Sequence, residues 1–209
     1  MEIKVIGRRS PVDVPWAIHR QKDAVVVNCC SNSSEGWQRD LSPFIIGPVE
    51  LYGEYVSKTF ENLWQYVKVY HEHLDENKEP TQEYWDWAKQ GWDNPRAVRY
   101  PMGKGRRPAY SLWDGKKLDY ITARKVIYVP LYATAVQKTA GFQYLKELAK
   151  DNDIILRDFD GYDETAMGMS LLQVLNYPQK KMGHAFVLKM LLTNDQEALE
   201  EIWKVSQSY

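Results

Sequence analysis

Residues 58–74 read KTFENLWQYVKVYHEHL, and over this stretch the pattern of the chain changes from strand to helix. Apolar residues recur every three or four positions from Phe60 to Leu74, which predicts a helix with one buried stripe. Thr59 stands just before the first turn, where a hydroxyl can accept from unpaired backbone N–H groups, so we predict it as the N-cap. Glu61 follows in the first turn, near the positive end of the helix dipole.

Strands are predicted on the N-terminal side of this helix. Residues 2–7 alternate in polarity, residues 24–28 form a β-branched run typical of a buried strand, and residues 49–56 alternate again around a glycine. Residues 1–57 therefore form a strand-rich part of the chain.

Helical patterns dominate from residue 58 to residue 209, so we predict a predominantly helical α+β fold in one domain spanning residues 1–209. Residues 153–157 are the predicted strand of this part, and residues 92–108, with three prolines and two glycines, form a long basic loop. The segment 116–138 is predicted as one helix kinked at Pro130, with a strand over 125–129 as the alternative. The other predicted helices span residues 81–90, 141–150, 165–175, 183–192 and 195–205.

Composition excludes several classes of protein. Lys and Arg number 27 against 28 Asp and Glu, so the whole chain has no electrostatic reason to bind nucleic acid or an anionic membrane. The most apolar stretch, residues 126–136, contains a proline and is too short to span a bilayer. Two adjacent cysteines, Cys29 and Cys30, indicate a reduced chain, and we expect a cytoplasmic protein that needs no metal or cofactor. Eight Trp and fourteen Tyr exceed what a core needs, so some are expected at a binding surface.

Glu61 is the first candidate functional residue. It shares a helical face with Gln65 and Lys68, and Lys58, Trp64 and Tyr66 flank it, so it is equipped to meet a polar ligand at the edge of the core. The alternative is a surface glutamate that only satisfies the helix dipole.

A basic loop over residues 96–107 is the second candidate. Glycines separate Lys104 from Arg106 and Arg107, which lets backbone N–H groups approach an anion. Trp113 follows the loop and can stack on a flat ring. The alternatives are a solvated loop and a tryptophan that anchors the core.

An acidic turn and a short basic segment complete the candidates. Asp158, Asp160 and Asp163 follow the strand predicted at 153–157, where carboxylates can act as acid, base or cation stabiliser. The spacing faintly resembles a calcium loop, but the downstream glutamate is missing, and a plain acidic turn is the alternative. Residues 180–184, KKMGH, can place an amine such as that of Lys181 near a phosphate.

Taken in order along the chain, these segments resemble the NADAR / YbiA-like family of N-glycosidases. The resembling segments are Leu41-Ser42-Pro43-Phe44, Tyr52-Gly53-Glu54, Glu61 in KTFENLWQYVKVY, Arg96 to Arg107, Trp113, Asp158 or Asp160, and Lys181 to His184. Two positions depart from the family pattern, since Asn62 replaces a histidine and Pro43 an asparagine.

This resemblance implies a small N-terminal sheet packed on an orthogonal helical core. It also implies cleavage of a base–ribose bond in an ADP-ribosyl or phosphoribosyl substrate. That substrate is a small nucleotide or an ADP-ribosylated nucleobase, and the nucleobase can be part of a nucleic acid. Glu61 takes the catalytic role, with Asp158 or Asp160 assisting the departing base or holding ribose. The residues expected to bind the substrate are Lys58, Trp64, Tyr66, Arg96, Lys104, Arg106, Arg107, Trp113 and Lys181.

Two other functions stay open at this point. The same site can capture a NAD-derived nucleotide without cleaving it, which the replaced accessory positions favour. The basic loop and the aromatic residues can instead serve a nucleic-acid or protein partner, in which case binding weakens steeply with salt. The glycosidase hypothesis makes a geometric prediction, namely that Glu61, Trp113 and one of the two aspartates line one cleft with Arg106 or Arg107 at its rim.

Overall fold

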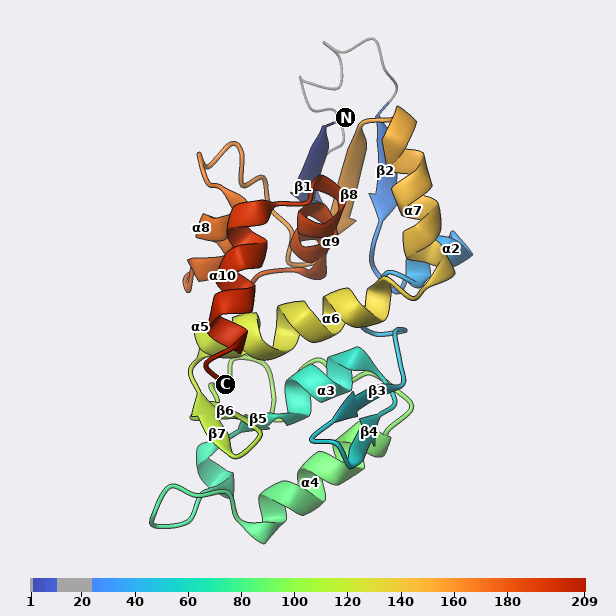
Figure 1. Ribbon diagram of the computed structural model, residues 1–209. Helices are drawn as coiled ribbons and strands as arrows, with labels where there is room; N and C mark the ends of the chain where they lie inside the picture. The colour runs from blue at the N-terminus through green and yellow to red at the C-terminus, as the bar shows by residue number, and fades with distance from the viewer. Residues whose placement is uncertain (1, 11–23) are drawn as a thin grey trace.

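The computed structural model describes residues 2–10 and 24–209 and shows an α+β fold with small sheets (Figure 1). The upper sheet in that view has the strand order β1-β8-β2, built from β1 (Ile3–Gly7), β8 (Ile154–Asp158) and β2 (Val25–Asn28). Both pairings are parallel, with Val5 and Val27 each opposite Leu156. The strand predicted at 153–157 is therefore the centre of the N-terminal sheet.

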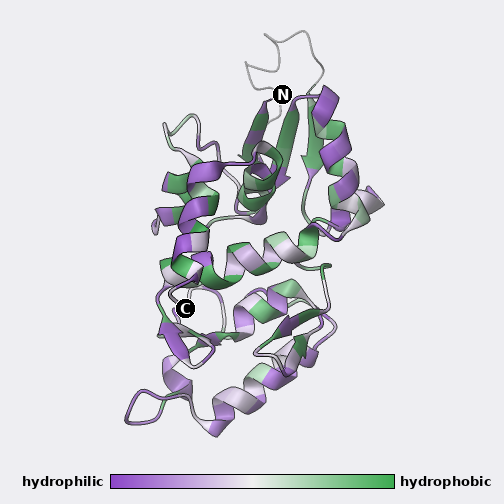
Figure 2. Ribbon diagram, in the orientation of Figure 1, coloured by the Kyte–Doolittle hydropathy of each residue, from purple (hydrophilic) through white to green (hydrophobic). Residues whose placement is uncertain are grey.

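Helices pack around this sheet. Helix α9 (His184–Thr193) contacts β1 and β8, while α7 (Ala140–Asp151) lies beside β2 and packs on α2 (Gly36–Arg39) (Figure 1). The strands are mostly hydrophobic, whereas α7 alternates between polar and apolar positions (Figure 2). This contrast is typical of buried parallel strands beside an amphipathic helix.

The lower half contains the helix predicted from residues 58–74. Helix α3 (Phe60–Tyr66) packs on α4 (Gln82–Asp93) and on a hairpin of β3 (Val49–Leu51) and β4 (Tyr55–Ser57). A second antiparallel sheet joins β5 (Lys68–Val69), β6 (Tyr110–Trp113) and β7 (Lys116–Leu118). The predicted N-cap is confirmed, because Thr59 Oγ1 accepts from the backbone N–H of Asn62 at 3.2 Å.

A continuous helical segment separates the two halves (Figure 1). It consists of α5 (Tyr120–Ala123), a π-helical turn (Arg124–Tyr128) and α6 (Val129–Val136). Pro130 lacks the N–H that would continue a regular helix through this point, and the widened turn precedes it. The predicted interruption at Pro130 is thus a π-helical turn, and the alternative strand over 125–129 is wrong.

Three predicted boundaries differ from the structure. The helix expected to reach Leu74 ends at Tyr66, with Val67 as its C-cap, because Lys68 and Val69 pair with β6 and a short 3₁₀ turn (His71–His73) follows. Residues 116–118 are strand β7 instead of helix. The helix expected from residue 165 begins later as α8 (Leu171–Asn176), since Gly168 has φ = 67° and Ser170 forms a capping box with Gln173.

The remaining helices are close to their predicted limits, ending with α10 (Gln196–Ser206), which packs on α8 and the π-helical turn. Within the described residues, no helix is both long and apolar enough to cross a membrane.

Candidate active site

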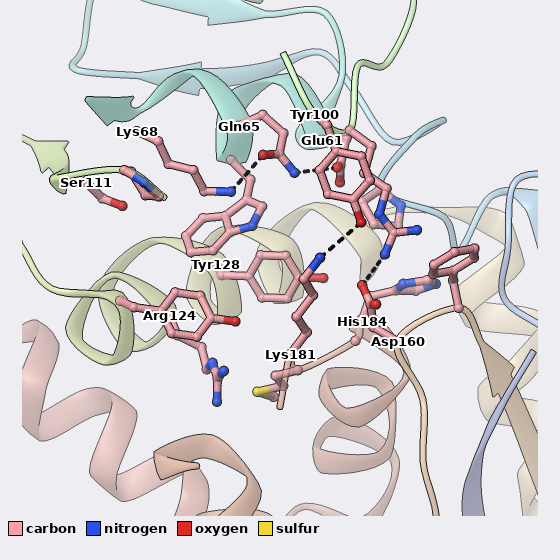
Figure 3. A pocket seen from close by; sticks show the side chains of 18 of the residues that line it. Glu61, Gln65, Lys68, Tyr100, Ser111, Arg124, Tyr128, Asp160, Lys181 and His184 are labelled. Carbon is pink, nitrogen blue, oxygen red and sulfur yellow. Dashed lines mark hydrogen bonds and ion pairs between the residues drawn. The ribbon is translucent and has the colours of Figure 1, made fainter. Parts of the chain in front are cut away.

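A cavity of about 830 Å³ lies where α3, the π-helical turn and the segment after β8 meet (Figure 3). Its volume falls within the range of about 300–1,000 Å³ that is usual for small-molecule sites. Further parts of the wall come from residues 30–32, 42–44, 99–111 and 178–184. Segments from most of the chain therefore converge on one hollow.

Glu61 lies on the wall of this cavity and is only 6% exposed. Its backbone N–H donates to the carbonyl of Pro43 at 2.8 Å, which ties the start of α3 to the loop before it. Its carboxylate accepts from Gln65 Nε2 at 2.8 Å (Figure 3). Burial raises the pKa of Glu61, and the Gln65 hydrogen bond and the nearby positive charge of Lys68 offset part of that rise.

Lys68 extends the same row of side chains, at the point where α3 has passed into β5. Its Nζ donates to Gln65 Oε1 at 2.8 Å and lies 4.5 Å from the centre of the Trp64 ring. Burial of the amine away from water lowers the pKa of Lys68 to about 8, although the negative charge of Glu61 acts to raise it. The three residues predicted to share a helical face thus form a hydrogen-bonded row, Lys68–Gln65–Glu61.

Aromatic rings form another wall. Tyr128, from the π-helical turn, packs edge-on against Trp64 with ring centres 5.0 Å apart, and Tyr120 lies 6.5 Å from Trp64. Burial raises the pKa of Tyr128 well above its ordinary value, with Asp158 and Glu61 adding to the effect, so its hydroxyl keeps its proton. Such a wall can hold a flat ring.

Asp158 is the last residue of β8 and is 2% exposed. Its Oδ2 accepts from the backbone N–H of Ala185 at 3.2 Å and lies 3.3 Å from His184 Nδ1. The other ring nitrogen of His184 lies 2.8 Å from the carbonyl oxygen of Cys29, which can only accept, so Nε2 donates. Gly183 permits this arrangement, because a Cβ there would lie 2.0 Å from Asp158 Oδ2.

Asp160, the other predicted acid, is paired with Arg99, whose guanidinium also lies 3.8 Å from the centre of the Phe159 ring (Figure 3). Lys181 donates to the hydroxyl of Tyr100 at 3.0 Å on the same side of the cavity. Both aspartates are therefore engaged by N–H donors of the protein.

The cavity is basic, although the whole chain has a net charge of −1. Its lining cations outnumber its lining carboxylates, Glu61, Asp119, Asp158 and Asp160. The cations are Arg8, Lys68, Arg99, Arg106, Arg107, Arg124 and Lys181. Among the described residues Arg107 forms no ion pair, whereas Arg106 pairs with Glu72. Within the same ranges, no group of three or more His, Cys, Asp or Glu side chains is arranged to hold a metal ion.

The structure brings together part of the predicted site. The predicted residues that do line the cavity are Glu61, Trp64, Arg106, Arg107, Asp158, Asp160 and Lys181. The predicted cleft is therefore present with its acid, both aspartates and its arginines, but Trp113 is not in it. That ring packs instead against Tyr52, 5.1 Å between centres, because β6 turns it toward the hairpin.

Four other residues predicted to bind substrate lie outside the cavity lining. Lys58 pairs with Asp93 at 2.8 Å on the surface, and Tyr66 packs on Trp87 with ring centres 4.5 Å apart. Arg96 is exposed, and its carbonyl accepts from Asn62 Nδ2 at 3.0 Å. Lys104 is also exposed, between two glycines that do line the cavity.

Asn62, which stands where the resemblance expects a histidine, has a structural position. Its amide donates to the carbonyls of Asn94 and Arg96 and accepts from the N–H of Val98 at 2.8 Å. The side chain is fully buried and holds the loop that carries Arg99 against α3. This replacement therefore lies outside the cavity lining.

Tyr128, Arg99 and His184 were not singled out from the sequence. Tyr128 faces the cavity because it lies in the π-helical turn, and the sequence pattern of residues 116–138 does not reveal that turn. Arg99 and His184 fall inside the basic segments noted above, but their acidic partners are 61 and 26 positions away, which no local pattern connects.

A model of one protein family matches residues 16–167, and that family is described as a family of unknown function (DUF6939). The expected membership of the NADAR / YbiA-like family is therefore wrong, because the family that matches is a different one. No curated protein and no solved structure matches the chain significantly. The match includes Glu61, Asp158 and Asp160 and covers more than half of the 209 residues, so the protein belongs to the DUF6939 family.

Proposed function

We propose that the protein is an N-glycosidase that hydrolyses the bond between a base and ribose in an ADP-ribosyl or phosphoribosyl substrate. The observation that carries the proposal is the Glu61 carboxylate, which is shielded from bulk water yet lies on the wall of a basic, aromatic-lined cavity. The proposal rests on this chemistry alone and not on family membership.

The reaction explains why a shielded carboxylate is useful. Breaking an N-glycosidic bond builds positive charge on the sugar ring, and a fixed negative charge in a partly dry site stabilises that state strongly. The Gln65 amide holds one Glu61 oxygen in place. The other oxygen is available to orient a water molecule on the sugar.

The walls match the two ends of such a substrate. Trp64, Tyr120 and Tyr128 offer flat surfaces for a base. Arg107 offers a guanidinium group that can bind phosphate in a bidentate manner, and Arg106, paired with Glu72, lies beside it. Asp158 and Asp160 lie on the side of the cavity where ribose hydroxyls can donate to them.

The test compares wild type with Glu61→Gln on ADP-ribosylated nucleobases and on phosphoribosyl N-glycosides, with released base measured by chromatography. We expect turnover by wild type and a loss of about 100-fold or more in the variant, since removal of one charge-stabilising group has this effect in comparable sites. The control is Glu50→Gln, an exposed glutamate of β3 outside the cavity, which should keep wild-type activity.

Other outcomes would contradict the proposal. Tight binding of ADP-ribose in calorimetry without release of any base supports nucleotide capture instead. Equal turnover by wild type and Glu61→Gln removes Glu61 from the reaction.

The free thiols of Cys29 and Cys30 support the accompanying proposal that the protein works in the reducing cytoplasm.

A further inference from the structure

The proposed reaction needs an acid as well as Glu61. The departing base takes the electron pair of the broken C–N bond, so an uncharged base leaves as an anion unless a proton reaches its nitrogen. A positioned proton donor typically contributes about 10²–10⁴-fold to such a step. The question is which group on the cavity wall can supply that proton.

The two aspartates are poorly placed for this role. Asp160 is paired with the guanidinium of Arg99, and Asp158 accepts from the N–H of Ala185 beside His184. Both carboxylates are thus held by donors of the protein itself, and neither is directed at a base stacked beside Trp64.

Tyr128 and Lys181 are also poorly suited to protonate the departing base. Burial makes the Tyr128 hydroxyl a weaker acid than free tyrosine, so it can donate a hydrogen bond but does not release a proton readily. Lys181 lies exposed at the rim and donates to Tyr100.

Lys68 satisfies the geometric requirements. Its ammonium lies on the cavity wall, one hydrogen bond from Gln65 and two from the carboxylate of Glu61. Gln65 takes one of its three N–H groups, and among the described residues no other acceptor is bonded to Nζ. The remaining N–H groups are available to a molecule that stacks beside Trp64 (Figure 3).

We propose that Lys68 is the general acid that protonates the departing base, and that the substrate therefore carries an uncharged base and not a pyridinium such as that of NAD. This inference rests on the proposed function. It names a catalytic residue and the class of leaving group for the same site.

The charges in the cavity support both the role of Lys68 as acid and the uncharged leaving base. Lys68 already occupies one face of Trp64, with Nζ 4.5 Å from the ring centre, so a cationic base meets a cation where it would stack. Burial lowers the pKa of Lys68 to about 8, which brings the ammonium near the pH at which it can release a proton. The charged groups that act on this amine are Glu61, which favours the ammonium, and Lys181 and Arg99, which disfavour it.

The C–N bond breaks, its electron pair goes to the base nitrogen, and the Lys68 ammonium gives that nitrogen a proton. Water adds its oxygen to the sugar carbon and gives a proton to the Glu61 carboxylate. Proton transfer from Glu61 back to Lys68, directly or through solvent, restores both groups, so the net reaction is hydrolysis.

The experiment uses two substrates that share the sugar phosphate preferred by wild type, one with an uncharged purine or pyrimidine and one with nicotinamide. Wild type should cleave the first substrate faster. Lys68→Met should lose about 100-fold in kcat on the uncharged base and less than about 3-fold on nicotinamide, which leaves without a proton. Lys68→Arg keeps the charge but holds its proton, so it should lose activity on the uncharged base as well.

The pH profile separates this role from a purely structural one. With the uncharged base, kcat/KM of wild type should fall as pH rises through about 8, because the acid is lost, and Lys68→Met should lack this limb. Lys146→Met, at an exposed lysine of α7 outside the cavity, is the matched control and should behave as wild type. Thermal unfolding of each variant checks that it folds.

Each contrary result has a separate meaning. If wild type cleaves either substrate but Lys68→Met loses the same factor on both, or loses nothing, the role of Lys68 is refuted while the proposed function stands. A wild-type preference for nicotinamide refutes the leaving-group class. If wild type cleaves neither, the proposed function fails and this inference fails with it.

Discussion

Glu61 and Asp158 are both buried carboxylates that line the cavity, but their surroundings differ. Asp158 faces a backbone N–H and an imidazole, whereas the described part of the chain gives the Glu61 carboxylate one hydrogen bond, from the neutral amide of Gln65. Glu61 is therefore less well compensated for its burial, and its pKa rises. A carboxylate in this condition interacts strongly with positive charge that develops nearby.

This difference predicts the acid side of the pH profile. The reaction needs Glu61 ionised, so kcat/KM should fall as pH falls through the pKa of Glu61, and that limb should lie above the ordinary pKa of glutamic acid. The measurement is kcat/KM from pH 4 to pH 8 with one substrate. A limb at or below the ordinary value would contradict the assignment of Glu61.

Gly183 is a second residue whose identity follows from the geometry. We expect Gly183→Ala to displace Asp158, because the new Cβ would lie 2.0 Å from its Oδ2 and 2.9 Å from its Cγ. The strain should lower the free energy of unfolding by about 1–3 kcal/mol, as overpacking usually does. Urea denaturation measures the change.

A matched alanine substitution is available in the same chain. At Gly36 an added Cβ would meet only Arg39 Nη2, at 3.7 Å, which is ordinary contact. Gly36→Ala should therefore leave stability nearly unchanged, and an equal loss in both variants would show that close approach to Asp158 is not the cause.

At the scale of elements, the passage from α3 to β5 shapes the candidate site. The helix stops at Tyr66, with Val67 as its C-cap, because the next residues pair with β6, with Lys68 opposite Ser111. Lys68 consequently projects from a strand, while Glu61 and Gln65 project from the helix before it. The row of hydrogen bonds that links them spans the boundary of two elements.

Arg124 joins two other elements and gives a testable consequence. Arg124 is only 1% exposed. Its guanidinium donates to the carbonyls of Val174 and Leu175 in α8, and to those of Tyr177 and Lys180 beyond it. We expect Arg124→Met to lower the free energy of unfolding by about 3 kcal/mol, since several charge-assisted bonds to carbonyls at and beyond the end of α8 are lost.

The same variant should also raise KM, because the segment after α8 carries Lys181 to the rim of the cavity. Lys125→Met is the control in the neighbouring position, where one ion pair with Glu201 is lost. It should cost less than Arg124→Met and leave KM unchanged. Equal effects of the two variants in urea denaturation and kinetics would contradict this role for Arg124.

Local patterns predicted some elements well and others poorly, for identifiable reasons. The start of α3, its N-cap Thr59 and the position of Glu61 depend on neighbouring residues alone, and they were predicted. The end of α3 depends on pairing with β6, more than forty positions away, and the pattern of Val67 and Val69 fits a helix as well as a strand.

The candidate site likewise combines features set by neighbouring residues with features set by distant contacts. Glu61, Gln65 and Lys68 follow from helical spacing, so their alignment was visible in the sequence. Trp113 was chosen because it follows the basic loop, but its direction is set by the tertiary contact with Tyr52. Tyr128 takes its place on the cavity wall because of a π-helical turn, which composition does not reveal.

For the whole molecule, the cavity joins the two halves seen in Figure 1. Glu61 and Lys68 belong to the lower half, whereas Asp158 and His184 follow from the upper sheet and its helix α9. The π-helical turn between the halves contributes Tyr128. Alignment of the site therefore depends on the packing of all three parts.

The order β1-β8-β2 has a consequence during synthesis. The first two strands leave the ribosome early but do not touch each other, because their shared neighbour is made more than a hundred residues later. Until then the nascent chain holds two unpaired strands, whose edges are the kind of surface that chaperones shield. Asp158 is the last residue of that late strand, so a half-made chain already carries Glu61 but has nothing opposite it.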